Sequence, residues 1–314
     1  MKSHSKLIKF IEVAKGIVNK LPRYNSKFSN RIYDNHQKII LLVIKQKFRL
    51  TYRGLIDFLY ISSELCSILK LKRTPHHTTL VKFAKKISAS LLDELILEKE
   101  AEIIAIDASG FQTNNMSYYY ANAWNRQDKR RRRRYLKISI AIDTKKQSVL
   151  SYKIRLGPRN DNIDFQSVLK NLSAKFVVAD KGYDSRANRY FVLRKMKAYP
   201  HIAKRIISGA TYERAGVKLK FDEKIYHQRS KVETAFSVIK RKYGSIVLSK
   251  KFDTQKKEII FRLIAYNVDR DVILSSLLIR GIQQSQKKKK INTLPAMYCN
   301  EAKGFFSWIT SSAS

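Results

Sequence analysis

The sequence is poor in the residues that cross-link, break or loosen a chain. It has 2 cysteines, 5 prolines and 10 glycines among 314 residues. Cys66 and Cys299 are distant and form no CxxC spacing, which excludes a disulfide framework and a cysteine-type zinc site. Hydrophobic residues make up 44% of the chain, so a disordered protein is also excluded. We expect an ordered protein of two domains, one of them small.

Acidic residues are scarce as well. The 25 Asp and Glu residues stand against 64 Lys and Arg, which gives a formal net charge of +39. Such an excess repels itself unless a polyanion neutralises it, so nucleic acid is the expected partner. Apolar stretches such as Ile39–Ile44 fall far short of the roughly 20 residues of a membrane-spanning helix. Because lysines also interrupt the first twenty residues, no signal peptide is expected, and we predict a cytoplasmic, nucleoid-associated protein.

Residues 1–95 are predicted to form a helical DNA-binding domain, since apolar residues recur there at helical spacing. Thr51 is expected to cap one helix, Pro75 to end another element and Thr78 to cap the next, with His76 and His77 at its start. The apolar stripe of that last helix leaves three lysines outward: Lys82, Lys85 and Lys86. This pattern predicts a helix-turn-helix whose second helix enters a major groove. A three-helix bundle with a solvated lysine face is the alternative.

From residue 96 to 280 the pattern changes to strands alternating with helices. Four segments rich in Ile and Val are predicted strands: 103–107, 136–143, 149–156 and 176–180. Helices are expected at 165–172 and 186–196, and a hairpin turn at 145–147. The alternation predicts a mixed α/β sheet, and the lysine-rich residues 281–314 are expected to form a basic tail.

A run of five arginines follows the first predicted strand, at Arg130, Arg131, Arg132, Arg133 and Arg134. Aromatic residues beside the run, at 118–120 and at Trp124, suit stacking on bases. We therefore predict that the run contacts nucleic acid, with a solvated loop as the alternative, whereas Trp124 alone is more simply a buried or interface residue.

Two predicted strands each deliver a carboxylate. Asp107 follows the apolar residues 103–106, and Asp180 follows 176–179. Neighbouring carboxylates repel one another, and a divalent cation is the usual remedy. Magnesium prefers such oxygen ligands, so both residues are candidate metal ligands. A structural aspartate is the alternative at each position, and Asp184, one helical turn later, is the alternative to Asp180.

A third element carries polar residues at helical spacing. Tyr226, Arg229, Glu233 and Lys240 fit Y-x2-R-x3-E-x6-K and would form one stripe on a continuous helix. Val232, Phe236, Ile239 and Tyr243 form the apolar stripe that would dock this helix on the sheet. Glu233 is thus expected beside the strand ends; a surface Arg–Glu pair would explain neither Tyr226 nor Lys240.

On these motifs, the chain resembles the DDE transposases of prokaryotic insertion sequences, in the group with the Y-R-E-K signature and its insertion-sequence-five family. The resemblance covers about residues 35–270 and depends on residues 52–59 (YRGLIDFL), 75–80 (PHHTTL), 105–111 (AIDASGF), 179–185 (ADKGYDS) and 226–240.

The resemblance implies a ribonuclease-H-like catalytic domain in which Asp107, Asp180 and Glu233 bind two Mg²⁺ ions, with Mn²⁺ as a substitute. Tyr226, Arg229 and Lys240 would hold DNA. The protein would act as a homodimer, and its partners would be the terminal inverted repeats and the target DNA. The segment 157–161 departs from the pattern by having Asn160 where relatives often show His, so Asn160 receives no role.

The sequence leaves open the roles of two other acidic residues and two alternative functions of the protein. Asp161 is a possible helper of the metal ligands, and Asp164 is expected to be a cap residue. A ribonuclease-H-like nuclease or junction resolvase would hydrolyse DNA without strand transfer, and a domesticated repressor would bind DNA without cutting it.

Overall fold

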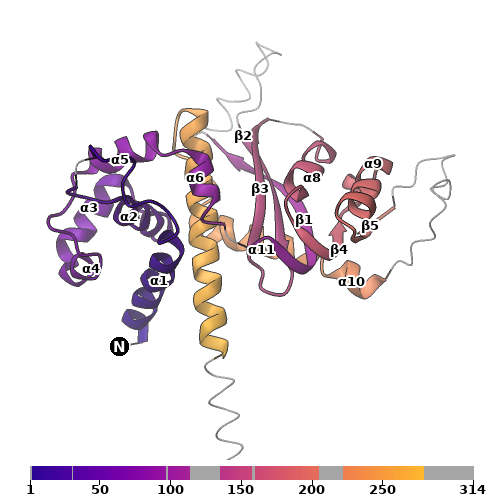
Figure 1. Cartoon of the computed structure of the whole chain (residues 1–314), viewed down its shortest axis with the longest axis horizontal. Coiled ribbons are helices and arrows are strands. Elements are labelled where there is room, and N and C mark those ends of the chain that lie inside the picture. The colour runs from indigo at the N-terminus through magenta and orange to yellow at the C-terminus, as the bar shows by residue number, and fades with distance from the viewer. Residues whose placement is uncertain are drawn as a thin grey trace, which may run out of the picture. The chain divides into compact units, whose positions relative to one another are not determined.

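The computed structural model describes residues 2–29, 31–96, 98–113, 135–157, 160–204 and 222–278 (Figure 1). The chain divides into two units, Met1–Arg270 and Asp271–Ser314. In the second unit only residues 271–278 are described, and they are helical. Among the described residues, no helix is long and apolar enough to cross a membrane.

The N-terminal part of the first unit is helical, as predicted. The described helices there are α1 (Lys2–Val18), α2 (Asn35–Lys47), α3 (Tyr52–Ile61), α4 (Ser63–Ile68), α5 (His77–Lys86) and α6 (Ala89–Asp93). Thr51 caps α3, because its hydroxyl accepts a hydrogen bond of 2.9 Å from the Gly54 N–H. The capping role expected for Thr78 was wrong, since His76 is the N-cap of α5. The Thr78 hydroxyl instead makes a 2.8 Å hydrogen bond with Nδ1 of His76.

Helix α5 packs against α2 and α3 through an apolar face. Leu80, Phe83 and Ala84 are buried, whereas the side chains of Lys85 and Lys86 are exposed and that of Lys82 is also exposed. Residues 69–76 separate α4 from α5, which is longer than the three- or four-residue turn of a compact helix-turn-helix. The apolar spacing therefore predicted the helix and its exposed face, but not the length of the connection before it.

Five strands form one mixed sheet. They are β1 (Glu100–Gln112), β2 (Tyr135–Asp143), β3 (Val149–Leu156), β4 (Ser173–Ala179) and β5 (Tyr199–Ile202). Their order is β3-β2-β1-β4-β5. The first three strands are antiparallel neighbours, and β4 and β5 run parallel to β1. This is the mixed α/β sheet that the sequence predicted, with the hairpin turn at 145–147 in its expected place.

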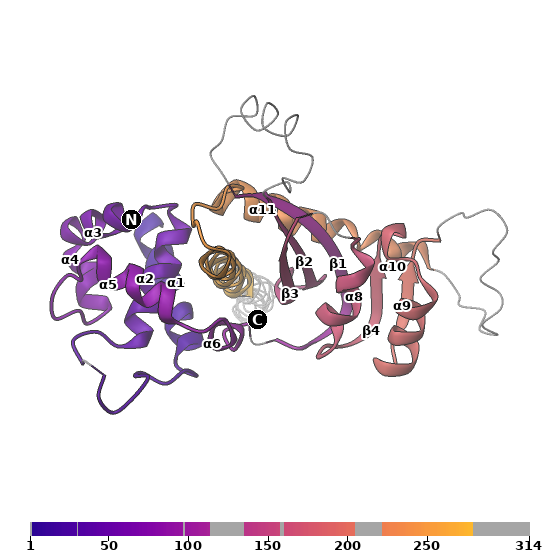
Figure 2. The ribbon, with the colours of Figure 1, turned by 90° about the horizontal axis from the view of Figure 1, so that it is seen from above.

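One face of the sheet is covered by α8 (Asn162–Leu169), α9 (Arg186–Tyr190) and the π-helical turn Phe191–Lys195. Alternate residues of β1, including Ile104 and Ile106, pack there against Phe165, Val168 and Val192. The intervening residues of β1 point to the other face, because side chains alternate along a strand. Figure 2 shows α8 and α11 (Ser230–Tyr243) on opposite sides of the sheet.

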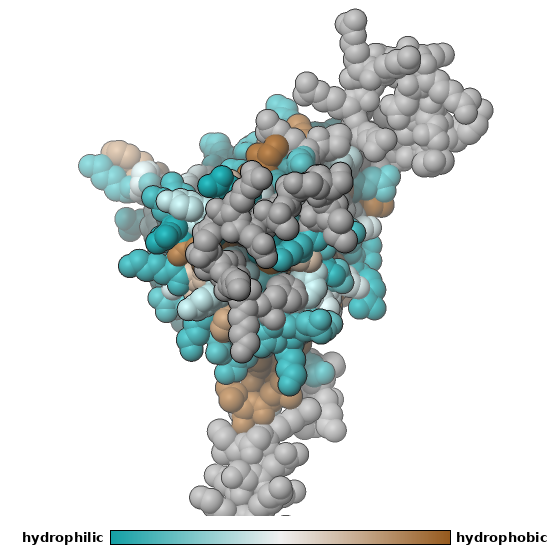
Figure 3. All heavy atoms as spheres, turned by 90° about the vertical axis from the view of Figure 1, so that its right-hand side faces the viewer, coloured by the Kyte–Doolittle hydropathy of each residue, from teal (hydrophilic) through white to brown (hydrophobic). Residues whose placement is uncertain are grey.

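The parallel edge of the sheet is short. Strand β5 has four residues, including Pro200, and within the described part of the chain it pairs only with β4. Figure 3 views the molecule from the side of β5, and hydrophilic residues dominate the coloured surface there. After β5 the described chain resumes with α10 (Glu223–His227) and α11, and a long helix covers residues 252–278.

Candidate active site

The sheet register brings two of the predicted carboxylates together. Strands β1 and β4 are parallel, and their last paired residues are Ile106 and Ala179. The next residue along the chain is an aspartate in each case, Asp107 in β1 and Asp180 just after β4, so the two lie at adjacent positions next to the last paired residues. Strand β4 ends there, and the Asp180 carboxylate accepts a 2.7 Å hydrogen bond from the Lys181 N–H.

The environment of Asp107 opposes its negative charge. Burial raises the pKa of the Asp107 carboxyl to about 6, and the charges of Glu233 and Asp161 push in the same direction. A hydrogen bond from the Ala108 N–H and the charge of Arg229 act against this rise. A carboxylate that burial and like charges destabilise gains from a cation close by.

Helix α11 supplies the third carboxylate. Its apolar side is buried through Val232, Phe236, Ile239 and Tyr243, as the sequence predicted, and also through Ala235, and the helix contacts β1 and β2. On its other side Glu233 keeps 53% of its side chain exposed. The docking of α11 thus leaves Glu233 exposed to solvent, yet close enough for its charge to act on Asp107.

Arg229 lies among these acids. Its Nη1 is 2.6 Å from Oε1 of Glu233, an ion pair between residues four apart. Burial would lower the pKa of Arg229, but the hydrogen bond and charge of Glu233, with Tyr226 and Asp180, raise it overall. Because Arg229 also acts on the Asp107 charge, one guanidinium partly neutralises all three carboxylates.

Among the described residues, no group of three or more His, Cys, Asp or Glu side chains is arranged to hold a metal ion. Glu233 is paired with Arg229 in this structure, which leaves Asp107 and Asp180 as the adjacent pair. Their donor atoms are carboxylate oxygens, the ligands that Mg²⁺ prefers, so the chemistry of the site fits such an ion.

Lys240 approaches the same strand as Asp107. Its Nζ donates a 2.7 Å hydrogen bond to the hydroxyl of Ser109 and lies 5.2 Å from the ring centroid of Phe111. Burial lowers the pKa of Lys240. Ser109 is two residues beyond Asp107 and therefore on the same face of β1. Ser109 was not predicted from the sequence, although this alternation could have identified it.

The prediction of one continuous helical stripe was wrong for Tyr226. It lies in α10, and α11 begins only at Ser230. The N–H groups of Gln228, Arg229, Lys231 and Val232 bond to carbonyls three residues earlier, which tightens the chain between the helices. Tyr226 lines a pocket with Ala203, Lys204, Glu223 and His227. Glu233 and Lys240 do share α11, with Arg229 at its N-cap position.

Asp184 has a structural role. Its side chain is fully buried and pairs with Nε of Arg189 at 2.8 Å, while Nη2 of Arg189 donates to the carbonyl of Ile202. These bonds tie α9 to β5. The geometry therefore favours Asp180 over Asp184 as the acid beside Asp107.

Asp164 is not the cap residue that the sequence suggested. It is buried within α8 and pairs with Nη2 of Arg155 at 2.7 Å, and the hydroxyl of Ser139 donates to it at 3.0 Å. Asp161 forms an ion pair with Lys137 of β2 and is close enough to raise the pKa of Asp107.

Several predicted nucleic-acid contacts lie outside the described residues. They are the basic run Arg130–Arg134, the aromatic residues at 118–120, Trp124 and the tail 281–314.

Comparison with known proteins identifies the family. Residues 98–268 match the family model described as Transposase DDE domain, and no curated protein matches the chain. Among solved structures, a piggyBac transposase synaptic complex with hairpin DNA is similar over 83% of this chain and 70% of that chain, with 12% identity and a TM-score of 0.43. Because the family match spans more than half of the 314 residues, the chain belongs to the family of transposases with a DDE domain.

Proposed function

We propose that this chain is the transposase of a prokaryotic insertion sequence of the insertion-sequence-five family. In this proposal it binds the terminal inverted repeats, cleaves DNA there and transfers the strands to target DNA. The observation that carries the proposal is the parallel register of Ile106 with Ala179, which sets Asp107 and Asp180 side by side next to the helix of Glu233.

Asp107, Asp180 and Glu233 would hold two Mg²⁺ ions, with Mn²⁺ able to substitute. Bound there, the ions would supply positive charge to the attacking and leaving oxygens of phosphoryl transfer. The chain's own contribution is to present carboxylate oxygens from the middle of β1, from the end of β4 and from one helix. Glu233 must leave Arg229 to join the set, and the released guanidinium is then able to bind a DNA phosphate bidentately.

Lys240 and Tyr226 complete the proposed DNA contacts near the carboxylates. Lys240 is held against β1 by Ser109 and Phe111, so its ammonium lies on the face of β1 that carries Asp107. The lysines of α5, Lys82, Lys85 and Lys86, are proposed to hold the repeat, together with Arg130–Arg134. Two transposon ends imply a homodimer, working in the cytoplasm at the nucleoid.

The test is a cleavage and strand-transfer assay on labelled repeat-end DNA with Mg²⁺. Asp107→Asn, Asp180→Asn and Glu233→Gln are each expected to abolish both steps and to leave DNA binding intact, because each swap removes a charge and keeps the shape. Glu102→Gln is the control on β1, the strand of Asp107. Glu102 is exposed, and its ion pair with Lys175 is long, at 3.8 Å.

The products separate the rival functions. Cleaved ends joined to target DNA support the transposase, whereas hydrolysis without joined products would identify a nuclease or resolvase. Repeat binding without any cleavage by the wild-type protein would identify a repressor. A single carboxylate variant with wild-type cleavage would remove that residue from the site.

A further inference from the structure

The first part of the long C-terminal helix, residues 252–270, contacts the sheet, the turn after α11 and the N-terminal helices. We call this segment the clamp helix. Its contacts with the sheet are made near the β2–β3 hairpin. The hydroxyl of Tyr266 donates to the carbonyl of Gln147 at 2.7 Å, and the Asn267 side chain makes two 2.8 Å hydrogen bonds with the backbone of Val149. The clamp helix is thereby fixed to the backbone of the catalytic sheet.

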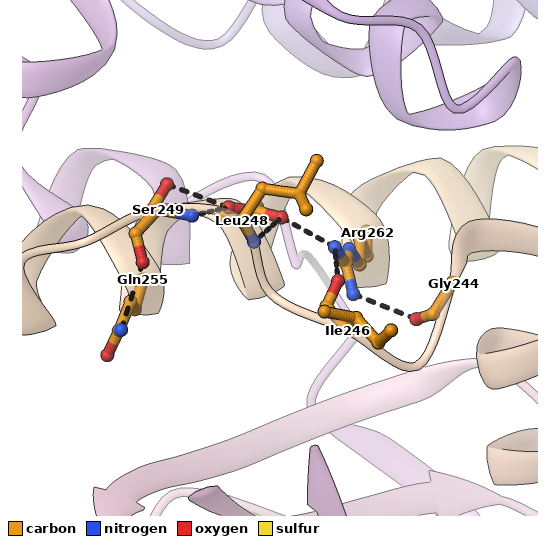
Figure 4. Close-up of polar contacts among 7 residues, drawn as sticks. Gly244, Ile246, Leu248, Ser249, Gln255 and Arg262 are labelled. Atoms are coloured by element: carbon orange, nitrogen blue, oxygen red, sulfur yellow. Dashed lines mark hydrogen bonds and ion pairs between the residues drawn. The ribbon is translucent and has the colours of Figure 1, made fainter. Parts of the chain in front are cut away.

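A second set of contacts joins the clamp helix to the end of α11. Nη1 of Arg262 donates to the carbonyl of Gly244 at 2.8 Å, and Nη2 donates to the carbonyl of Ile246 at 2.7 Å (Figure 4). Glu258 accepts from the N–H groups of Leu248 and Ser249. Gly244 has φ of +97°, a conformation that favours glycine and ends the helix. The turn after α11 is thus held by buried charged side chains.

The same turn also reaches β1. The N–H of Gln112 donates to the carbonyl of Ser245 at 3.1 Å, and the N–H of Val247 donates to the carbonyl of Gln112 at 2.7 Å. Strand β1 carries Asp107 and α11 carries Glu233. The clamp helix is therefore connected to both elements of the proposed active site.

A third set of contacts joins the clamp helix to the N-terminal helices. Nζ of Lys257 donates to the carbonyl of Lys85 at 2.6 Å, at the end of α5. Nζ of Lys47, on α2, pairs with Asp269 at 2.5 Å and lies 3.9 Å from the ring centroid of Phe10. Lys257 is 5% exposed and Asp269 is 8% exposed. Separating these elements would break a buried ion pair and a hydrogen bond from a buried ammonium, so the contacts resist relative movement.

We infer that the clamp helix fixes the position of the DNA cut relative to the repeat sequence that the N-terminal helices bind. This inference rests on the proposed function. Successive phosphates of one DNA strand are separated by about 3.4 Å along the helix axis. A displacement of a few ångströms between α5 and the carboxylates would therefore place a neighbouring phosphate at the active site.

The test uses the full chain with Lys47→Met and Lys257→Met combined. These changes remove the Lys47–Asp269 pair and the Lys257–Lys85 hydrogen bond, together with the 2.6 Å pair of Lys257 with the exposed Asp253 of its own helix. Asp269 keeps its partner Lys242 at 2.5 Å. The matched control is Lys153→Met with Lys256→Met, which removes the same charge. Lys153 is exposed on β3, and Lys256 lies over Phe252 of its own helix.

The cut positions are mapped at single-nucleotide resolution on end-labelled repeat DNA, with each protein at the concentration that binds the same fraction of the DNA. The clamp variant is expected to cut at two or more neighbouring phosphates, whereas the wild type and the control cut at one. Each single variant should spread the cuts less, and the single variants take the place of the double variant if it does not fold.

A clamp variant that binds and still cuts at one wild-type position would overturn this inference and leave the proposed function standing. A wild-type protein that binds the repeat without cutting would overturn the proposed function, and this inference with it.

Discussion

The charge of Asp107 is expected to destabilise the metal-free protein, which makes Asp107→Asn a stabilising change. Burial and the neighbouring acids raise the pKa of Asp107 from 3.8 to about 6. A shift of about two units corresponds to about 3 kcal/mol of differential interaction, and partial solvent access reduces this to about 1–3 kcal/mol. Asparagine keeps an oxygen for the Ala108 N–H and carries no charge.

The pH dependence has a definite sign. A carboxyl with a raised folded-state pKa binds more protons in the folded state, so its stabilising contribution is present below pH 3.8 and is lost as pH rises through about 6. The advantage of Asp107→Asn over the wild type should therefore grow with pH, with roughly half of it developing between pH 5 and pH 8. Above about pH 8 it should be constant.

The measurement is urea unfolding at about pH 5 and pH 8 in the presence of EDTA. Mg²⁺ at the higher pH should then raise the free energy of unfolding of the wild type more than that of the variant, because a ligand stabilises the state that binds it. Glu102→Gln should match the wild type throughout. A variant no more stable than the wild type at the higher pH, or an advantage independent of pH, would refute the reasoning.

The remaining predictions concern the neighbours of Asp107 and the lysines of α5. Arg229→Ala should lower cleavage by about ten- to a hundredfold, a positioning loss of roughly 1.4–2.7 kcal/mol, without weakening Mn²⁺ binding in a calorimetric titration. Arg229→Lys should stay impaired because an ammonium cannot rebuild a bidentate contact, whereas Lys240→Arg should retain more activity; equal rates would contradict this. Asp184→Asn should cost about 3 kcal/mol in unfolding experiments by breaking a buried ion pair, and Asp180→Asn should not. Replacing Lys82, Lys85 and Lys86 with Met should flatten the salt dependence of repeat binding by up to about 0.9 log units for each phosphate that these lysines neutralise, and an unchanged slope would exclude them from the DNA interface.

The sequence predicted the parts of the fold that depend on local patterns. Runs of Ile and Val predicted β1 to β4, and the apolar stripe of α11 predicted the face that docks on the sheet. Strand β5 was missed because it is four residues long and contains Pro200, which lacks a donor for the sheet. The break between α10 and α11 was missed because side-chain spacing does not record a change from i−4 to i−3 hydrogen bonds.

In the candidate site, too, local patterns predicted some residues, and contacts distant in the sequence were missed. Asp107 and Asp180 were predicted from their positions after apolar runs, and the register places them together. The expectation that a strand ends at Asp107 was wrong, because β1 continues to Gln112, whereas β4 does end before Asp180. The pairing of Arg229 with Glu233 is local, and from the sequence it was considered only as an alternative. The partners of Asp164 and Ser109 lie 25 and 131 residues away, so no local pattern reveals these contacts. Strand alternation alone would place Ser109 on the same face of β1 as Asp107.

Pro200, in the edge strand β5, has a consequence for self-association. An open strand edge offers unpaired N–H and carbonyl groups to any second chain, and copies held on one DNA molecule would meet at high local concentration. Strand β5 offers only four residues, and Pro200 removes one N–H from them. Continuous β-augmentation between copies is therefore disfavoured at this edge, also where the proposed binding to one DNA molecule would bring copies together.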